Sequence, residues 1–157
     1  MARLLRQEYG VKWGVDIVIK KNIPVAAGLG GGSSNAASAL LGLNKLWGLK
    51  LNRFQLLSIA ERMGSDVSFF IYDYPWALGK ERGNHIKKLN IRTKLWHVLV
   101  VPKVKIYSRD VYKGCRTNIL TKRKDNVNIF IRYLKRGDLS AIGEALKNDL
   151  ENSVLRL

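Results

Sequence analysis

Four glycines occupy five consecutive positions in Gly28-Leu29-Gly30-Gly31-Gly32, and this run constrains the fold more than any other feature of the chain. Before it, the alternating, β-branched segment Val11–Lys20 predicts a strand. After it, Asn35–Leu41 predicts a helix, with Ser33 or Ser34 as its N-cap. Glycines let backbone amides approach an anion closely, and a helix N-terminus adds the positive end of its dipole. The order of strand, glycine loop and helix therefore predicts a phosphate-binding loop.

Two common phosphate loops do not fit these residues. The Walker loop needs a Gly-Lys-Ser/Thr ending, and the dinucleotide fingerprint needs an acidic residue about 20 positions further on in a βαβ unit. Neither requirement is met. A flexible connection remains an alternative, but such a linker has no need of apolar residues before it, such as Val25, or of paired serines after it. We therefore favour a phosphate loop of another kind.

The chain is strongly basic, with 28 Lys and Arg against 12 Asp and Glu and a formal net charge of +16. Such a charge attracts polyanions, including nucleotides, nucleic acid and acidic lipid, without choosing among them. The basic residues are scattered from Arg3 to Lys124 and form no tail, so we interpret them as a solvated surface. No nucleic-acid-binding arm is expected.

The cysteine content and hydropathy indicate a cytoplasmic protein. Cys115 is the only cysteine, and no spacing of Cys and His suggests zinc, as is usual in a reducing compartment. No apolar run approaches the roughly 20 residues that span a bilayer. At 157 residues, of which 46% are hydrophobic, the chain fits one domain, or one domain with part of another.

The rest of the chain mixes helical and strand patterns. A helix from the cap Asn52 to the terminator Gly64 is expected to bury Phe54, Leu57, Ala60 and Met63, which recur at helical spacing. Leu95–Val101 is a continuous apolar run, typical of a strand buried on both faces. Pro102 marks an expected boundary between domains at residues 1–102 and 103–157. Further helices are expected over residues 2–9, Ser108–Lys113, Asn126–Lys135 and Ala141–Leu150, and a further strand over Trp76–Gly79.

The glycine run and its flanks resemble a known signature. Pro24-Val25-Ala26-Ala27-Gly28-Leu29-Gly30-Gly31-Gly32-Ser33-Ser34-Asn35-Ala36-Ala37 resembles the second signature of the GHMP kinases, which reads Pro, three residues, Gly-Leu-Gly/Ser-Ser/Gly-Ser. Within that superfamily, the triple glycine followed by Ser-Ser and then Asp or Asn is similar to the diphosphocytidyl-methylerythritol kinases of the non-mevalonate isoprenoid pathway. Asn35 is one of the two residues usual at that position. Five further segments agree with that family in order and approximate spacing: Leu43–Trp47, Gly64–Phe70, Arg82-Gly83, Val111-Tyr112 and Asn148–Glu151.

The chain also departs from the family at several positions. Ser68 stands where the family usually has Pro, Asn84 where it has Glu, and Tyr107-Ser108 where it has Ser-Thr. None of these changes removes a group that we assign to the chemistry.

The resemblance implies an α+β GHMP kinase fold. It would comprise a partial N-terminal domain like domain 2 of ribosomal protein S5, lacking its first strands, and then the start of a ferredoxin-like C-terminal domain. The implied activity is ATP-dependent phosphorylation, with Mg²⁺ accompanying the nucleotide, of the tertiary 2-hydroxyl of the diphosphocytidyl-methylerythritol substrate. That reaction belongs to isoprenoid biosynthesis.

The loop and its surroundings supply the expected ATP site. The glycines form the cradle, the serines add hydroxyls and amides at the helix start, and Lys21 is close enough in sequence to place a cation by the nucleotide. The expected ATP-binding residues are Lys21, Pro24, Val25, Ala26, Ala27, Gly28, Leu29, Gly30, Gly31, Gly32, Ser33 and Ser34.

Two residues are assigned by the resemblance. Asp66 is implied as the catalytic base and as a substrate contact; from spacing alone, capping of a helical turn through Phe69 and Phe70 is an equal alternative. Tyr112 matches the aromatic ring that stacks on the substrate's cytosine; without the resemblance it would pass as a helix core residue.

The resemblance also implies parts that this sequence does not contain. Members of the family have an upstream Lys that pairs with the aspartate, a Gly-Tyr-His segment that grips the cytidine, and a third glycine-rich segment. We therefore expect a fragment with weak activity or none. The alternatives are another GHMP kinase acting on mevalonate, homoserine or a sugar, and a basic nucleic-acid-binding module.

Overall fold

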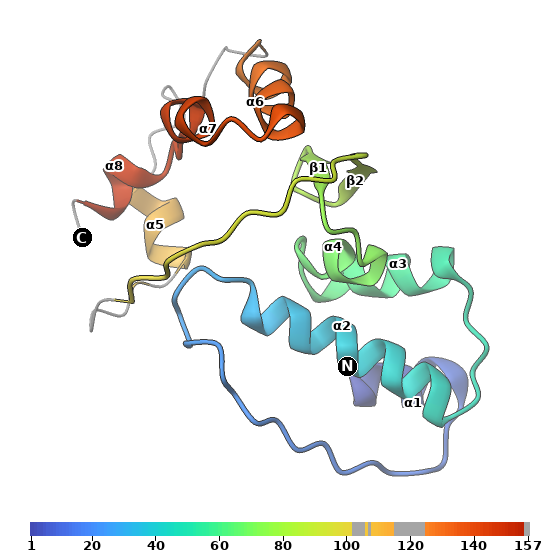
Figure 1. Ribbon diagram of the computed structural model, residues 1–157. Coiled ribbons are helices and arrows are strands. Elements are labelled where there is room, and N and C mark those ends of the chain that lie inside the picture. Colours follow the sequence, from blue (N-terminus) through green and yellow to red (C-terminus); the bar gives the residue numbers. More distant parts are fainter. Residues whose placement is uncertain (102–105, 107, 115–124, 156–157) are drawn as a thin grey trace. The chain divides into compact units, whose positions relative to one another are not determined.

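Figure 1 shows the computed structural model, which describes residues 1–101, 106, 108–114 and 125–155. The chain divides into two compact units. The first comprises Met1–Val25 and Leu29–Leu89, and the second comprises Ala26–Gly28 and Asn90–Leu157. Pro102, the expected domain boundary, lies outside the described residues, as does Cys115.

The first unit joins helices to a small antiparallel sheet. Its elements are α1 (Ala2–Tyr9), α2 (Gly31–Leu46), α3 (Arg53–Met63), α4 (Val67–Tyr72), β1 (Ala77–Lys80) and β2 (His85–Lys88). The two strands pair in a register that places Ala77 opposite Lys88 and Lys80 opposite His85. Helix α2 packs against α1, α3 and α4, as Figure 1 shows.

Local signals in the sequence account for several helix ends. Helix α1 ends at Gly10, whose φ of 63° is left-handed and whose amide donates to the carbonyl of Arg6. Helix α3 begins with a reciprocal capping box between Asn52 and Gln55, with both bonds 3.0 Å long, and ends at Gly64. These boundaries confirm the predictions for both helices.

The core of the first unit lies between α2, α3 and α4. Helix α2 contributes Ala37, Leu40 and Leu43. The remaining members are Leu5, Leu51, Leu56, Ile59, Ala60, Val67 and Ile71. The predicted buried stripe of α3 is partly wrong, because Phe54 is 82% exposed and Met63 is 41% exposed. Ala60 is buried as predicted, and packing against α2 and α4 also buries Leu56 and Ile59.

Two predicted strands are wrong. Val11–Lys20 forms no regular secondary structure and is unpaired, with Val18 94% exposed. Leu95–Val101 is likewise unpaired, and Trp96 is 98% exposed instead of buried. A β-branched sequence forms a strand only when a neighbour completes its hydrogen bonds. Within the described ranges the only such ladder joins β1 to β2, so both segments are left without one.

The second unit is helical in its described part. It contains α5 (Ser108–Gly114), α6 (Asp125–Arg136), α7 (Leu139–Ala145) and α8 (Glu151–Val154). Helix α6 packs on α7, and α5 on α8. The single helix expected over Ala141–Leu150 is wrong at its end, because α7 stops at Ala145. Asp138 caps α7 by accepting from the amide of Ala141 at 3.1 Å. The start of a ferredoxin-like domain here stays a prediction.

Candidate functional site

The glycine loop leads directly into α2, the longest helix of the described residues. Gly30 is its N-cap in the left-handed region, with φ of 65°, and its carbonyl accepts from the amide of Ser34 at 2.9 Å. The helix therefore begins at Gly31, before the serines that were expected to cap it. Its first turn contains no acidic residue. The positive end of its dipole is left without a countercharge from its own side chains.

Gly32 marks an open face at this helix start. Gly32 is exposed, and a Cβ added there would meet no atom within 4 Å. The backbone amides of the first turn lack intrahelical partners in any α-helix. The space immediately beside Gly32, in the first turn of α2, is therefore open.

Lys21 lies beside the same helix start. Its ammonium donates to Oδ1 of Asn35 at 2.7 Å. A Cβ added at Gly31 would lie 2.9 Å from Nζ of Lys21 and 3.0 Å from Cγ2 of Ile23, so a side chain there would displace the Lys21 head group and crowd Ile23. A cation next to a helix N-terminus is electrostatically unfavourable by itself. The arrangement instead concentrates positive charge where an anion would be held.

Asp66 occupies the N-cap position of α4 but does not cap it. Its carboxylate is exposed and makes no cap hydrogen bond, which removes the capping alternative. Oδ1 of Asp66 lies 3.7 Å from the position of a Cβ at Gly83, in the turn between β1 and β2. Phe70 follows Asp66 by one helical turn, and its Cζ lies 3.0 Å from the position of a Cβ at Gly30. Helix α4 thus connects the carboxylate to the glycine loop.

Tyr112 lies on α5 in the second unit. Its side chain is 65% exposed, whereas its neighbour Val111 is buried. The ring is therefore free to stack on a ligand and is not a core residue.

The remaining predicted loop residues are mostly open to solvent. Val25 is 69% exposed and Leu29 is 40% exposed. Pro24, Ala27 and Gly28 are exposed, and Ala26, Ser33 and Ser34 are half-buried. Ala26 adopts φ of 60°, a left-handed conformation that is uncommon for a residue with a side chain.

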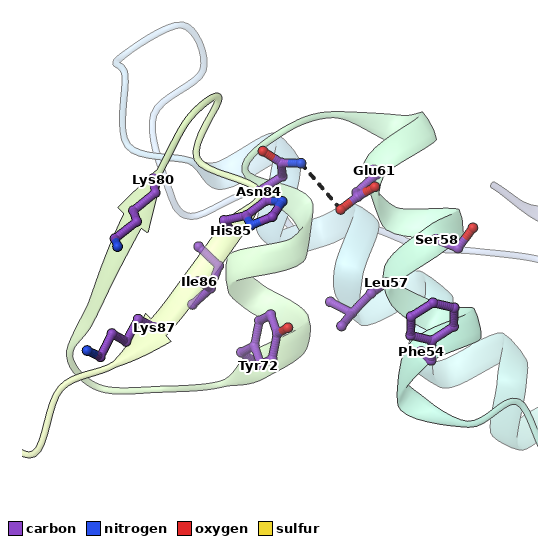
Figure 2. Close-up of a pocket in the computed structure, with 10 residues that line it drawn as sticks. All are labelled: Phe54, Leu57, Ser58, Glu61, Tyr72, Lys80, Asn84, His85, Ile86 and Lys87. Atoms are coloured by element: carbon purple, nitrogen blue, oxygen red, sulfur yellow. Dashed lines mark hydrogen bonds between the residues drawn. The ribbon is translucent and has the colours of Figure 1, made fainter.

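A groove of about 550 Å³ lies elsewhere in the first unit, between α3, the end of α4 and the β1–β2 hairpin (Figure 2). Nδ2 of Asn84 donates to Oε1 of Glu61 across it at 3.4 Å. Its walls are formed by Phe54, Leu57, Ser58, Glu61, Tyr72, Lys80, Asn84, His85, Ile86 and Lys87. None of the predicted site residues lines this groove, so it is not the candidate site.

Two features of the described residues bear on ions and membranes. These residues contain no group of three or more His, Cys, Asp or Glu side chains that could hold a metal ion. None of their helices combines the length and apolar character needed to cross a membrane.

Comparison with known proteins identifies the loop-bearing region. Residues 1–74 match the family described as the GHMP kinases N terminal domain. These residues carry a GHMP kinase N-terminal domain. The matched range contains the glycine loop, Lys21 and Asp66. The predicted GHMP kinase fold is confirmed for this part of the chain.

Curated relatives and a solved structure extend the likeness over almost the whole chain. The chain is 44% identical over 151 residues to a 4-diphosphocytidyl-2-C-methyl-D-erythritol kinase of Syntrophotalea carbinolica and 40% identical to one of Bacillus anthracis. Both matches cover 96% of this chain and 51% of the relative. A crystal structure of 4-(cytidine 5'-diphospho)-2C-methyl-D-erythritol kinase matches with a TM-score of 0.72 and 28% identity, over 99% of this chain and 54% of that one. The chain thus spans about half the length of the relatives it matches.

The structure brings two further residues to the glycine loop, which the sequence did not single out as candidate site residues. Asn35 contacts Lys21, and Phe70 packs beside Gly30. Both belong to the segments that carry the resemblance, but only their tertiary contacts show what they touch.

Proposed function

We propose that this chain supplies the ATP-binding core of a kinase that phosphorylates the 2-hydroxyl of 4-diphosphocytidyl-2-C-methyl-D-erythritol. The observation that carries the proposal is the ammonium of Lys21, held 2.7 Å from Asn35 at the glycine-rich start of α2. The names of relatives at 40% and 44% identity support the choice of substrate.

The residues around the loop suit binding of a triphosphate. The open start of α2 at Gly32, the dipole of α2 and the charge of Lys21 all favour phosphate oxygens. The half-buried hydroxyls of Ser33 and Ser34 stand in the same turn. Mg²⁺ is proposed to arrive with the nucleotide, because this ion is commonly held by substrate phosphates and only one or two carboxylates.

Asp66 is proposed as the catalytic base. In the transfer, a bond forms between the substrate's hydroxyl oxygen and the γ-phosphorus, the bond from that phosphorus to the β,γ-bridging oxygen breaks, and ADP leaves. The hydroxyl proton passes to the carboxylate of Asp66. An exposed carboxylate that caps no helix is available to accept it.

Tyr112 is proposed to stack on the cytosine of the substrate. Its ring is 65% exposed, and base stacking is worth about 1–3 kcal/mol per base. The domain limits 1–102 and 103–157, a cytoplasmic location and a role in isoprenoid biosynthesis remain predictions that accompany this function.

The two alternatives account for fewer observations. Another GHMP kinase would share the loop, but the relatives reported above carry the diphosphocytidyl-methylerythritol kinase name. A nucleic-acid-binding module would use the net charge of +16 and would have no need of Lys21 oriented at a glycine-rich helix start.

The test is calorimetric titration of Mg-ATP into the 157-residue chain and into a matched pair of variants. Gly32→Ala adds a methyl group at the open start of α2, whereas Gly42→Ala adds one further along the same helix, where a Cβ also meets nothing within 4 Å. Both changes replace a helical glycine that has no positive φ, so both favour the helix to a similar degree.

We expect the parent chain to bind Mg-ATP saturably. Gly32→Ala should weaken this binding about tenfold or more, because a phosphate contact is lost. Gly42→Ala should leave the affinity unchanged. Equal affinity of Gly32→Ala and the parent chain would overturn the assignment of the loop. Binding that disappears with rising salt and ignores both variants would support the polyanion alternative.

A further inference from the structure

Asn35 makes a specific side-chain hydrogen bond to Lys21. Its Oδ1 accepts from the ammonium of Lys21 at 2.7 Å, although the two residues are 14 positions apart. Asn35 is half-buried in α2, and Lys21 is exposed in the segment before the loop. A free lysine side chain samples many rotamers, so one hydrogen bond that holds its head group narrows the positions of the charge.

The helix start is shaped to admit this contact. Gly31 is buried, and a side chain there would collide with Nζ of Lys21, as its Cβ would lie only 2.9 Å away. Ile23 packs against the same point, 3.0 Å from that position. The segment from Lys21 to Ile23 therefore runs closely past the first turn of α2, and Asn35 holds the ammonium there.

We propose that Asn35 is a positioning residue, which holds the Lys21 ammonium at the start of α2 for contact with the phosphates of a nucleoside triphosphate. This inference rests on the proposed function and deepens it. Asn35 acts through Lys21 and is not proposed to touch the ligand.

The chemistry of the amide matters for this role. An amide oxygen accepts a hydrogen bond without neutralising the ammonium, so the full positive charge stays available to an anion. A carboxylate at position 35 would also accept from the ammonium, so the contact requires an acceptor oxygen at this position. The first turn of α2 contains no acidic residue, which is consistent with a site kept positive.

The experiment measures binding of inorganic tripolyphosphate to the 157-residue chain by calorimetry. This probe carries no base or sugar and so reports on the phosphate contacts alone. The variants are Asn35→Ala, Asn35→Asp, Lys21→Met and the double variant Lys21→Met/Asn35→Ala. Ser38→Ala is the matched control, since Ser38 is exposed on α2 one turn beyond Asn35.

We expect Lys21→Met to weaken binding about tenfold. Asn35→Ala should weaken binding about threefold to fivefold, as for loss of one solvent-exposed hydrogen bond. The double variant should bind like Lys21→Met alone, because Asn35 acts only through the lysine. Asn35→Asp keeps an acceptor oxygen for the ammonium, so this variant should bind more tightly than Asn35→Ala. Ser38→Ala should bind like the parent chain.

Two results would overturn the role of Asn35 and leave the proposed function intact. In the first, Asn35→Ala binds tripolyphosphate as tightly as the parent chain does. In the second, Asn35→Ala weakens binding by the same factor in the Lys21→Met background as in the parent chain. A parent chain that binds neither tripolyphosphate nor Mg-ATP would overturn the proposed function together with the inference. Thermal unfolding of each variant tests for a folding defect. The hydrogen bond between Lys21 and Asn35 is exposed to solvent, so the unfolding midpoint of each variant should lie close to that of the parent chain.

Discussion

The ring of Phe70 packs against the backbone of Gly30, with Cζ 3.0 Å from the position that a Cβ at Gly30 would occupy. This contact joins α4, which follows Asp66, to the N-cap of α2. The spacing between the glycine loop and the carboxylate therefore depends on the absence of a side chain at residue 30. Glycine at position 30 leaves room for the Phe70 ring. It also adopts φ of 65°, in the left-handed region that other residues rarely occupy.

Gly30→Ala should destabilise the first unit. A non-glycine residue in the left-handed region costs about 1–2 kcal/mol, and overpacking against Phe70 adds about 1 kcal/mol or more. We expect urea unfolding to show a total loss of about 2–3 kcal/mol from these two sources. The double variant Gly30→Ala/Phe70→Leu separates the two costs.

If the contact is as tight as the structure indicates, Gly30→Ala should cost less free energy in the Phe70→Leu background than in the parent. Strictly additive losses would contradict the contact. Because Gly30→Ala perturbs folding, Gly32→Ala is the cleaner probe of anion binding.

Ser68→Ala should stabilise the chain. The Ser68 side chain is fully buried, and its hydroxyl has no hydrogen-bond partner. An unsatisfied buried polar group costs about 1–3 kcal/mol, so its removal should raise the free energy of unfolding by about 1 kcal/mol. Chemical denaturation measures the change, with Ser58→Ala on the exposed face of α3 as control. A loss of stability would show that the hydroxyl is satisfied in solution.

Asn52→Ala should remove the capping box of α3. The Asn52 side chain accepts from the amide of Gln55, and the Gln55 side chain accepts from the amide of Asn52, both at 3.0 Å. Loss of an N-cap side chain typically costs about 1 kcal/mol. Thermal and urea unfolding should both report the loss, and Asn22→Ala, in an exposed segment outside the helices, should leave stability unchanged. Equal behaviour of the two variants would exclude a stabilising role for the box.

Asp66→Asn should separate catalysis from stability. The carboxylate is exposed and caps nothing, so we expect a change in unfolding free energy within about 0.5 kcal/mol. A lost general base typically lowers the rate by about 10²–10⁴-fold, so any phosphoryl transfer measured by ADP release should fall accordingly. Asp73→Asn, at the other end of α4, is the matched control and should retain the parent rate. A large loss of stability in Asp66→Asn would instead favour a structural role for Asp66.

Local signals were enough to predict most helices of this chain. Gly10 and Gly64 end helices α1 and α3 as expected, and Asn52 begins α3. Such boundaries depend on backbone conformation and on hydrogen bonds between residues a few positions apart, so the sequence already contains what determines them. The glycine run likewise predicted the start of a helix, and the structure places Lys21 beside that start, whereas the anion site stays a prediction.

Strand pairing and the buried faces could not be predicted in the same way. Val11–Lys20 and Leu95–Val101 have the composition of strands and yet remain unpaired, because a ladder depends on a neighbour that local sequence does not specify. On α3, contact with α2 and α4 buries Leu56 and Ile59 together with the predicted Ala60 and leaves Phe54 exposed.

The sequence by itself therefore determined the glycine loop, the helix that follows it and the family resemblance, since these depend on residues adjacent in the chain. Only the tertiary structure decided that Asn35 holds Lys21, that Phe70 packs at Gly30 and that Asp66 is free of a capping bond. Each of these relationships is set by how the helices and the segment before the loop pack together in space. Packing brings together side chains whose separation along the chain says nothing of their distance.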